Sequence, residues 1–468
     1  MNSTPNASAP AQSAPLFSGR ALFGIIFPLI LQQILSITIG TADSMMVAHA
    51  GEAAVSGVSL VNTLDTLLVL VFTSLVSGGS VVVAQALGRK DLKGARDAAK
   101  QLYCVTAVIA LVLSVIVILF RHPLLTLLFG AVEADVMESA LGYFFFVALS
   151  FLFLAIESAC AACFRVMGNS MVSLLASLMM NLINVGGNAL FILVLEWGAV
   201  GAAVATLIAR IVGATVLTVL LHSKKNDVYL EKVLHYKPDF RVIRSILHIG
   251  VPNGIENGMF QFGKLLTQTL ISTMPTAAIA GNAVANTLAN IQYMTGAAFS
   301  NTMVTVVGRC VGAEEKEQAK RYSRLLTVLE YLALFIMALV TVIFAKPLIA
   351  VYDLSPDSSA LAYRLILYHS ICAVLVWPIA FTLPSAFRAS SDVRFPLVVS
   401  MFSMWTFRVA LSYVFSLETV SILGWITFPG LGMGVMGVWV AMTVDWLFRT
   451  VMFIWRYVSG KWLTVKRI

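Results

Sequence analysis

Charged residues are scarce in this sequence. Only 12% of the 468 residues are Asp, Glu, Lys or Arg, whereas 59% are hydrophobic. Soluble domains are typically about 25% charged and about 45–50% apolar, so the mean hydropathy of +0.89 indicates that lipid surrounds most of the chain. In lipid, only helices and closed barrels satisfy every backbone hydrogen bond. The long apolar runs lack the period-two alternation of barrel strands and therefore predict helices.

Groups suited to metal, redox or covalent chemistry are also scarce. The five cysteines are an odd number, and each lies in or beside an apolar stretch. Cys160 and Cys163 form a C-x-x-C, but neither a second pair nor a histidine lies near them in the sequence. We interpret both as small buried apolar residues. No metal is expected, apart from Na⁺ as a coupling ion.

No nucleotide-binding motif is complete. Gly258-x4-Gly263-Lys264 resembles a phosphate-binding loop, but Leu265 stands where Ser or Thr holds magnesium, and no strand precedes it. No His, Cys or Ser constellation suits catalysis either. The sequence therefore predicts a protein that is not an enzyme, has no cofactor, binds neither nucleotide nor nucleic acid, and takes its energy from an ion gradient.

Twelve apolar stretches are long enough to cross a bilayer. The first, which runs from Ala21 to Val47, exceeds the 7–15 residues of a signal-peptide core and carries Asp43, so it is interpreted as a span. The low-complexity residues before it predict a disordered tail over 1–20. The fold class is thus an all-α membrane protein with twelve transmembrane helices. The predicted spans are 21–48, 54–77, 101–120, 139–162, 171–195, 199–221, 246–272, 277–300, 325–345, 361–385, 396–417 and 434–456.

Lys and Arg gather in the even-numbered connections between these spans. Basic residues are enriched on the cytoplasmic side of membrane proteins. We therefore expect a multi-pass protein of the cell inner (cytoplasmic) membrane, with both termini in the cytoplasm. The main basic residues are Arg89, Lys90, Lys93, Arg96, Lys100, Arg165, Lys224, Lys225, Lys232, Lys237, Arg241, Arg244, Arg309, Lys316, Lys320, Arg321, Arg324, Arg388 and Arg394, whereas the odd connections and their flanks have Arg121, Lys346 and Arg364.

The chain contains an internal repeat. A shift of 224 residues superposes Pro28 on Pro252, Gly88 on Gly312, and Asn62-Thr63-Leu64 on Asn286-Thr287-Leu288. Each half has an even number of spans, so the halves are parallel repeats related by a pseudo-two-fold axis along the membrane normal, an arrangement found in transporters. We expect a cytoplasmic tail (1–20), a first six-helix lobe (21–222), a cytoplasmic linker (223–243), a second six-helix lobe (244–457) and a cytoplasmic tail (458–468).

Polar residues in the first lobe suggest an ion site. A charged side chain at the bilayer centre costs about 2.5–3.5 kcal/mol on insertion scales, so each one needs a reason. Asp43 lies toward the outer end of the first span, where its carboxyl could take a proton or bind sodium, or lie at the interface without a role. Asn184 and Asn188 share a face of the fifth span, either as a wall facing Asp43 or as contacts between helices. Asp65 either joins this cluster or is a silent protonated acid.

The second lobe has a second polar stripe. Glu256, near the entry of the seventh span, is either a second ion site or the partner of Lys264, two turns further on. Gln261 on that span and Asn286 on the eighth are assigned with Glu256 to a secondary ion or substrate site. Two structural ion pairs are also expected from the intramembrane charges. They are Glu157 with Arg210 and Asp445 with Arg408.

Motifs spread over nearly the whole chain resemble the multidrug and toxic compound extrusion (MATE) family, in its bacterial form within the MOP flippase superfamily. The first half has Asp43-Ser44-Met45-Met46-Val47-Ala48, then Gly51, Ala54-Val55, Gly78-Gly79 and Gln85-Ala86-Leu87-Gly88. The loop Phe164-Arg165-Val166-Met167-Gly168 and the entry Gly250-Val251-Pro252-Asn253-Gly254 are also similar to family features. The order of these motifs along a repeated twelve-span chain gives the resemblance its specificity.

The resemblance implies an antiporter that exchanges protons or sodium for organic cations between two lobes. In the DinF-like branch an acid on the first span is the coupling residue, and Asp43 matches it; the branch's Asn-x3-Asp on the fifth span is Asn184-x3-Asn188 here. The NorM-like branch uses a glutamate on the seventh span, near Glu256, and an aspartate on the tenth, which is missing. Asp43 is thus the principal expected site.

These observations together predict alternating access. Ion binding at Asp43 changes the shape of the first span near a hinge at Pro28, and the lobes then release a lipophilic cation outward. The alternatives are a flippase for lipid-linked precursors, which requires a strongly cationic cavity, and an exporter of a natural metabolite. The expected partners are small lipophilic cations, H⁺ or Na⁺, and the lipid bilayer.

Overall fold

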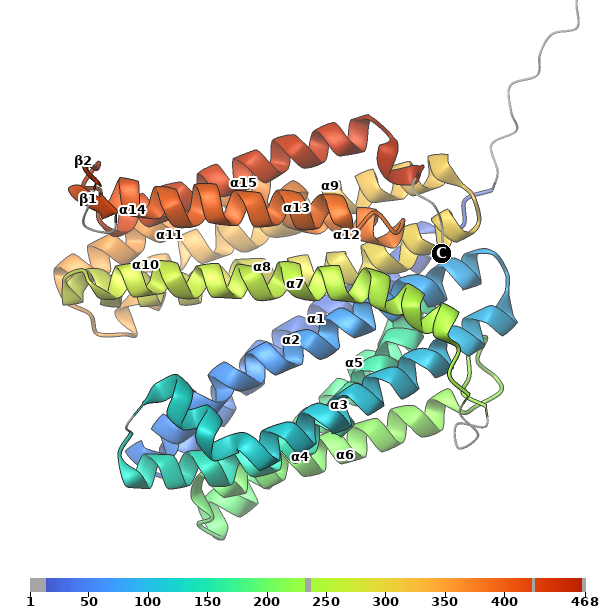
Figure 1. The fold of residues 1–468 in the computed structure, drawn as a ribbon, viewed down its shortest axis with the longest axis horizontal. Coiled ribbons are helices and arrows are strands. Elements are labelled where there is room, and N and C mark those ends of the chain that lie inside the picture. The colour runs from blue at the N-terminus through green and yellow to red at the C-terminus, as the bar shows by residue number, and fades with distance from the viewer. Residues whose placement is uncertain (1–13, 131, 232–236, 423–425, 465–468) are drawn as a thin grey trace, which may run out of the picture.

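The computed structural model describes residues 14–130, 132–231, 237–422 and 426–464, and almost all of them are helical. In the first half, six rods follow one another along the chain (Figure 1). They are α1 (Gly19–Ala48), α2 (Glu52–Gly88), α3 (Leu92–Phe129), α4 (Ala134–Val166), α5 (Ser170–Asn188) with its π-helical extension η1 (Ala189–Val194), and α6 (Gly198–Leu221).

The second half repeats this order with more interruptions. Its elements are α7 (Phe240–Ser272), α8 (Thr276–Gly312), α9 (Lys316–Ile343), α10 (Ala345–Ala350), α11 (Pro356–Trp377), π-helical η3 (Pro378–Thr382), α12 (Leu383–Ala389), α13 (Arg394–Ser403), π-helical η4 (Met404–Ala410), α14 (Leu411–Ser416), α15 (Val435–Val458) and the 3-10 turn η5 (Lys461–Leu463). A short antiparallel hairpin of β1 (Thr419–Ile422) and β2 (Ile426–Pro429), which the sequence analysis missed, precedes α15. Counting α5–η1, α11–η3–α12 and α13–η4–α14 as single rods, and the six-residue α10 as a connection, gives the twelve predicted spans within the described residues.

The seventh and eighth rods differ from the others in composition. Among the described residues, ten helices are long and apolar enough to cross a membrane, and α7 and α8 are not among them. Both are long, but α7 carries Glu256 and Lys264, and α8 carries Asn282, Asn286 and Asn290. Polar residues of this kind are tolerated at membrane depth when they face the protein interior or a cavity. We therefore expect α7 and α8 to line an internal cavity.

The two lobes diverge from a shared contact region at one end of the molecule (Figure 1). There α2 crosses α7 and α8 at positions that have no side chain. A Cβ atom on Gly88 would lie 2.1 Å from the carbonyl oxygen of Arg309, and one on Gly312 would lie 2.1 Å from that of Gln85. Gly88 and Gly312 are equivalent in the repeat, so the same glycine of each lobe permits the close approach of the other lobe's backbone.

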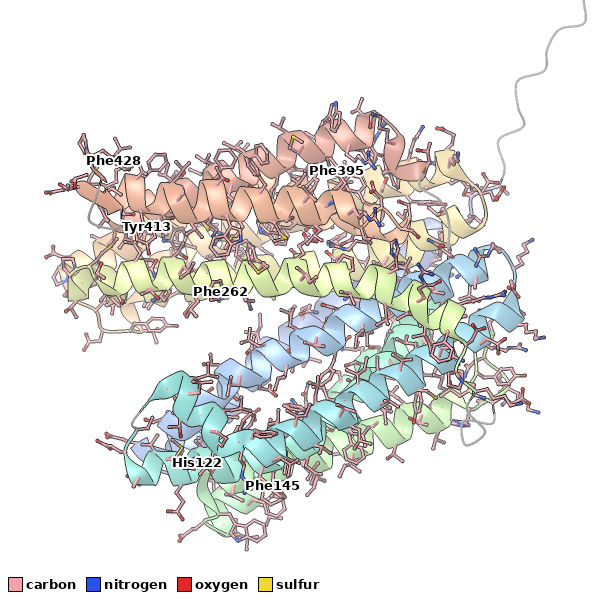
Figure 2. The ribbon with its side chains drawn as sticks, viewed as in Figure 1. His122, Phe145, Phe262, Phe395, Tyr413 and Phe428 are labelled. Atoms are coloured by element: carbon pink, nitrogen blue, oxygen red, sulfur yellow. The ribbon has the colours of Figure 1, made fainter. Side chains whose placement is uncertain are left out.

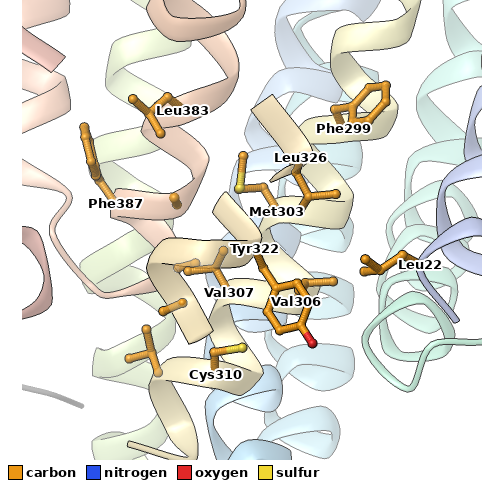
Figure 3. Close-up of a cluster of buried hydrophobic side chains, with 14 of the residues drawn as sticks. Leu22, Phe299, Met303, Val306, Val307, Cys310, Tyr322, Leu326, Leu383 and Phe387 are labelled. Carbon is orange, nitrogen blue, oxygen red and sulfur yellow. The ribbon is translucent and has the colours of Figure 1, made fainter. Parts of the chain in front are cut away.

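The first helix belongs to both lobes. Near its start, Leu22, Ile25 and Leu29 are buried in an apolar cluster with residues of the second lobe, among them Met303 of α8 and Phe387 of α12 (Figure 3). Near its end, Val47 is buried among residues of the first lobe. Pro28, the predicted hinge, is buried within the helix and lies in the part that packs on the second lobe. α1 is therefore a continuous connection between the lobes.

The described residues near both chain ends are held against the second lobe by aromatic anchors. Phe17 is 7% exposed, its N–H donates to the Tyr322 hydroxyl (3.0 Å), and that hydroxyl donates to its carbonyl (2.8 Å). At the other end, Trp462 is fully buried, and its carbonyl accepts a bond from Ser390. The prediction of a disordered tail is thus wrong for residues 14–20; residues 1–13, and residues 465–468 of the predicted C-terminal tail, lie outside the described residues.

The glycine crossing predicts a sharp contrast between two Gly→Ala substitutions. Gly88→Ala places a methyl group against backbone at the crossing of α2 and α8, and we expect a loss of about 1–3 kcal/mol of stability from overpacking. Gly186→Ala in α5 meets nothing within 4 Å and is expected to be neutral or slightly stabilising. Thermal unfolding of the detergent-solubilised variants measures both, and equal midpoints would contradict this account of the crossing.

Candidate functional site

A carboxylate and two amides meet in the interior of the first lobe. The Nδ2 of Asn188 donates to Oδ1 of Asp43 over 2.7 Å, which joins α1 to α5. The surrounding hydrogen bonds are best satisfied when the Asn184 amide is oriented so that its nitrogen also donates to Asp43, at 2.7 and 3.1 Å, and its oxygen accepts from Thr206 of α6 at 3.0 Å. Asn184 and Asn188 are 8% and 1% exposed. The structure therefore brings Asp43, Asn184 and Asn188 together.

The spacing of the two amides explains this geometry. Asn184 and Asn188 are four residues apart, so they lie one turn apart on one face of α5, and that face points at α1. Two amide nitrogens then make three contacts with one carboxylate, which stabilises its ionised form through charge-assisted hydrogen bonds. The Oδ1 of Asn188 is buried and has no donor within the described part of the chain. An added proton on the carboxyl group would be a suitable donor for it.

Asp65 has a different partner. Its Oδ2 lies 4.0 Å from the guanidinium of Arg210, and Arg210 in turn donates to the Ser150 hydroxyl over 2.6 Å. The expected pair of Glu157 with Arg210 is therefore wrong: Glu157 accepts a hydrogen bond from Ser158 instead. Asp65 is on α2, and it links α2 to α6 inside the first lobe. The sequence could not choose between the two acids, because both lie on interior faces of neighbouring helices.

The predicted secondary site is divided by the structure. Gln261 and Asn286 line a cavity of about 720 Å³ that also touches Thr63 and Thr66 of α2, so it lies between the lobes. Phe262 lies beside Gln261 on α7 and also faces this cavity (Figure 2). Glu256 is not part of its lining.

Glu256 instead connects helices within the second lobe. It lies 3.2 Å from Arg388 of α12 and accepts a 2.7 Å hydrogen bond from Ser400 of α13. The alternative in which Glu256 neutralises Lys264 is thus wrong, because Arg388, which the sequence placed in a connection, lies closer. This geometry gives Glu256 a complete set of partners without an added ion.

A smaller, aromatic pocket lies deeper in the second lobe. It measures about 150 Å³ and shares Lys264, Asn286, Asn290, Arg408, Trp439 and Met442 with the larger cavity. Its other walls come from α7, α8, α11, η3 and α15. They are Phe260, Ala289, Tyr293, His369, Trp377, Phe381 and Trp446. Sequence reasoning missed these rings; the seven-residue spacing of Trp439 and Trp446 on one face of α15 was the available signal.

A buried charge cluster adjoins this pocket at Arg408. Asp445 is fully buried and accepts bonds from Arg449 (2.8 Å) and Ser403 (2.5 Å). The expected pair of Asp445 with Arg408 is confirmed, at 3.8 Å. However, Arg449, which is four residues after Asp445 on α15, is the nearer partner. Arg408 is therefore the more loosely held of the two guanidinium groups.

The chain is similar to a known protein family and to curated relatives over most of its length. The model of the MatE family matches residues 28–190 and 252–414, and these two matches begin at Pro28 and Pro252, which the internal repeat superposes. The chain belongs to the MatE family. Curated relatives over 95% of its length include "Uncharacterized transporter YisQ" of Bacillus subtilis, 26% identical over 95% of that protein, and "Probable multidrug resistance protein NorM" of Thermotoga maritima, 25% identical over 93% of that protein.

Solved MATE structures have the same fold. One is described as the outward-facing conformation of a multidrug resistance MATE family transporter of the MOP superfamily; it has a TM-score of 0.85 at 16% identity and covers 95% of this chain and 96% of that chain. Another, a MOP superfamily transporter from Pyrococcus furiosus described as having a binding pocket of reverse polarity, has a TM-score of 0.83 at 16% identity, with 96% and 97% covered. The MATE resemblance and the prediction of twelve helices in two lobes are therefore confirmed.

The two arginines beside Asp445 are expected to differ in their effect on stability. Arg449→Met leaves a buried carboxylate without its hydrogen-bonded partner, and breaking a buried pair in this way costs about 3–5 kcal/mol. Arg408→Met removes a cation at 3.8 Å but leaves the Arg449 and Ser403 bonds intact, so the loss is expected to be much smaller. Chemical or thermal unfolding of both variants tests the ranking, and a larger loss for Arg408→Met would reverse the assignment.

Proposed function

We propose that this chain, a multi-pass membrane transporter of a multidrug efflux family, is an antiporter that exports small lipophilic cations in exchange for H⁺ or Na⁺. Asp43 is the coupling residue. The observation that carries this proposal is the Asp43–Asn188–Asn184 cluster on α1 and α5. Asp43 is a half-buried ionisable group held by two buried amides, and its charge can be neutralised by one small cation.

The path from this cluster to the other lobe is α1 itself. Asp43 lies near one end of α1, whereas Leu22, Ile25 and Leu29 near the other end pack on the second lobe. Pro28 cannot donate a backbone hydrogen bond, so the helix bends at lower cost near this residue than elsewhere. Neutralising Asp43 frees the amide donors of α5, changes the packing of α1, and thereby shifts the balance between two arrangements of the lobes.

The direction of opening follows from the basic residues. The contact region at Gly88 and Gly312 adjoins Arg89, Lys90 and Arg309, which belong to the basic connections. By the enrichment of basic residues on the cytoplasmic side, this closed end and both termini lie in the cytoplasm. The cavity between α2, α7 and α8 then opens outward, so the described arrangement is the releasing state, in the inner membrane of a bacterial cell.

The donors around Asp43 favour a proton over sodium. Na⁺ requires several oxygen ligands, but both amides present nitrogen to the carboxylate. No cluster of three or more acidic, His or Cys side chains occurs in the described ranges that could supply further ligands. A protonated Asp43, by contrast, can donate to the unpartnered Oδ1 of Asn188. We therefore propose H⁺ as the coupling ion.

One observation keeps the flippase alternative open as a second candidate. That alternative requires a cationic cavity, and two bases within the spans, Lys264 and Arg408, line the cavities of the second lobe. Arg210 and Arg449, by contrast, are paired with Asp65 and Asp445. Movement of an anionic fluorescent lipid between leaflets of proteoliposomes, abolished by Lys264→Gln, is the result that would favour it.

Asp43→Asn is expected to abolish gradient-driven efflux. The amide side chain is close in size but takes up no proton, so the step that couples the gradient to the lobes is lost. Ethidium efflux from cells or proteoliposomes measures this, with insertion checked by membrane expression. Asp97→Asn, an exposed carboxyl at the start of α3, is the matched control and is expected to keep full activity. Unchanged efflux by Asp43→Asn would defeat the assignment.

Separate ion gradients distinguish the two coupling ions. We expect ethidium transport in proteoliposomes to respond to an imposed pH gradient and not to an imposed sodium gradient at constant pH, because the amide nitrogens leave too few oxygen ligands for Na⁺. Transport driven by sodium alone would contradict proton coupling while leaving Asp43 as a candidate site.

A further inference from the structure

The cavities of the second lobe have the wrong polarity for a cation. The residues that line them come from α2, α7, α8, α11, η3, η4 and α15, and the charged side chains among them are Lys264 and Arg408. Among the residues that the structure describes, no Asp or Glu is part of either lining. A lipophilic cation entering here meets two like charges and no carboxylate, in contrast to the first lobe, where Asp43 is available.

Arg408 lacks partners for its donors. Its side chain is only 10% exposed, and the nearest carboxylate oxygen, Oδ2 of Asp445, is 3.8 Å away, beyond hydrogen-bond distance. The Oδ1 of Asp445 is already taken by Arg449 and Ser403. Within the described part of the chain, the Arg408 guanidinium makes no hydrogen bond, and it lies over the Phe260 ring at 5.0 Å. A buried guanidinium whose donors face a cavity is costly unless an acceptor arrives.

Lys264 adds a second unbalanced charge to the same space. It lines both cavities together with Arg408, and it forms no ion pair among the residues described. Asp445, the carboxylate nearest to Arg408, is already bonded to Arg449, so it does not balance the charge of Lys264 as well. Tyr293 and His369 do not compensate, because the tyrosine hydroxyl bonds the histidine ring and the other ring nitrogen bonds Gln292 at 3.1 Å.

Aromatic rings form much of the remaining wall of the inner pocket. Trp377 stacks between Tyr293 and Phe381, with ring centroids 5.0 and 5.2 Å apart and interplanar angles of 21° and 22°. Trp439 is held by a 2.9 Å hydrogen bond from its Nε1 to Asn282, which fixes its ring at the boundary of the two cavities. The outer cavity of about 720 Å³ lies within the range of about 300–1,000 Å³ that is typical for drug-sized ligands. The inner pocket of about 150 Å³ takes only one end of such a molecule.

The repeat shows that this site and the Asp43 cluster are at equivalent places. α5 begins at Ser170, and α13 begins at Arg394, which is 224 residues later. By this shift Asn184 corresponds to Arg408. By the same shift Asp43 corresponds to Thr267, which also lines the outer cavity. One lobe therefore has a carboxylate and an amide where the other has a hydroxyl and a guanidinium.

We propose that the second lobe holds a separate binding site for aromatic carboxylates, in which Arg408 and Lys264 bind the carboxylate and the Trp439 ring packs against the aromatic body. The planar fork of Arg408 suits a carboxylate, and Lys264 supplies a flexible second donor. The site goes beyond the proposed cation export, and its binding does not depend on Asp43.

Three probes with one ring system test the charge preference. The purified full-length protein in detergent is titrated with 2-naphthoate, 2-naphthamide and 2-naphthylmethylammonium, and quenching of tryptophan fluorescence reports binding. We expect the carboxylate to bind at least about tenfold more tightly than the neutral amide, since hydrogen bonds to charged groups contribute more than neutral ones, and the ammonium to bind most weakly. Equal affinities, or tightest binding of the ammonium, would overturn the proposal.

Matched variants locate the binding. Lys264→Gln is expected to weaken naphthoate binding about tenfold and to leave naphthamide binding unchanged, whereas Lys264→Arg retains the charge and stays within about twofold of the unsubstituted protein. Arg408→Met repeats the test from the other side of the pocket, with folding checked by the unfolding midpoint. Lys346→Gln, a lysine outside both cavities, is the control. Naphthoate binding that survives both Lys264→Gln and Arg408→Met would refute the site.

Two further arms separate this site from the transport proposal and from lipid. Asp43→Asn is expected to lose efflux yet bind naphthoate normally, so failure of one proposal leaves the other intact. In nanodiscs of phosphatidylcholine, addition of phosphatidylglycerol is expected to leave naphthoate binding within about twofold, because the aromatic pocket offers little to an acyl chain. Displacement of naphthoate by phosphatidylglycerol would assign the cations to a lipid headgroup and overturn the carboxylate site.

Discussion

A charged side chain that faces hydrocarbon costs several kcal/mol, and this constraint organises the interior of both lobes. Four intramembrane acids of the described structure are held by donors of another helix or of their own. Asp43 has amides of α5, Asp65 has Arg210, Glu256 has Arg388 and Ser400, and Asp445 has Arg449 and Ser403. These contacts connect helices that apolar packing alone would leave free to slide, and they leave few charged groups available for transport.

The available groups have opposite sign in the two lobes. Both lobes have the same helix order and an equivalent glycine at the crossing. Because Gly88 and Gly312 have no Cβ atom, the backbones of α2 and α8 can lie in direct contact there. At equivalent interior positions, however, the first lobe has Asn184 and the second lobe has Arg408. Symmetry is retained where the lobes must fit each other, and it is lost where each lobe faces its own interior, since nothing there requires the two to match.

The π-helical segments lie at these interior positions. η1 follows Asn188 directly, η3 follows Trp377, and η4 contains Arg408. A π-helical turn widens the helix and leaves backbone groups less well bonded, and such turns are frequent at functional sites. In this chain they place one cluster and one pocket beside helix segments whose hydrogen bonds can rearrange at low cost. The helices are thus most deformable beside the positions where an ion or ligand would bind.

The sequence by itself determined the solvent, the number of rods, the repeat and the amide face of α5, because apolar length, basic connections and helical spacing are local properties of the chain. It also offered Asp43 as one of two possible partners of that face, the other being a neighbouring helix. Only the tertiary structure decided that Arg210 pairs with Asp65, that Arg388 takes Glu256 away from Lys264, and that Phe17 and Trp462 anchor the termini. Partners of buried charges come from distant segments whose relative rotation is set by the packing of whole helices, and no spacing along the chain encodes that rotation.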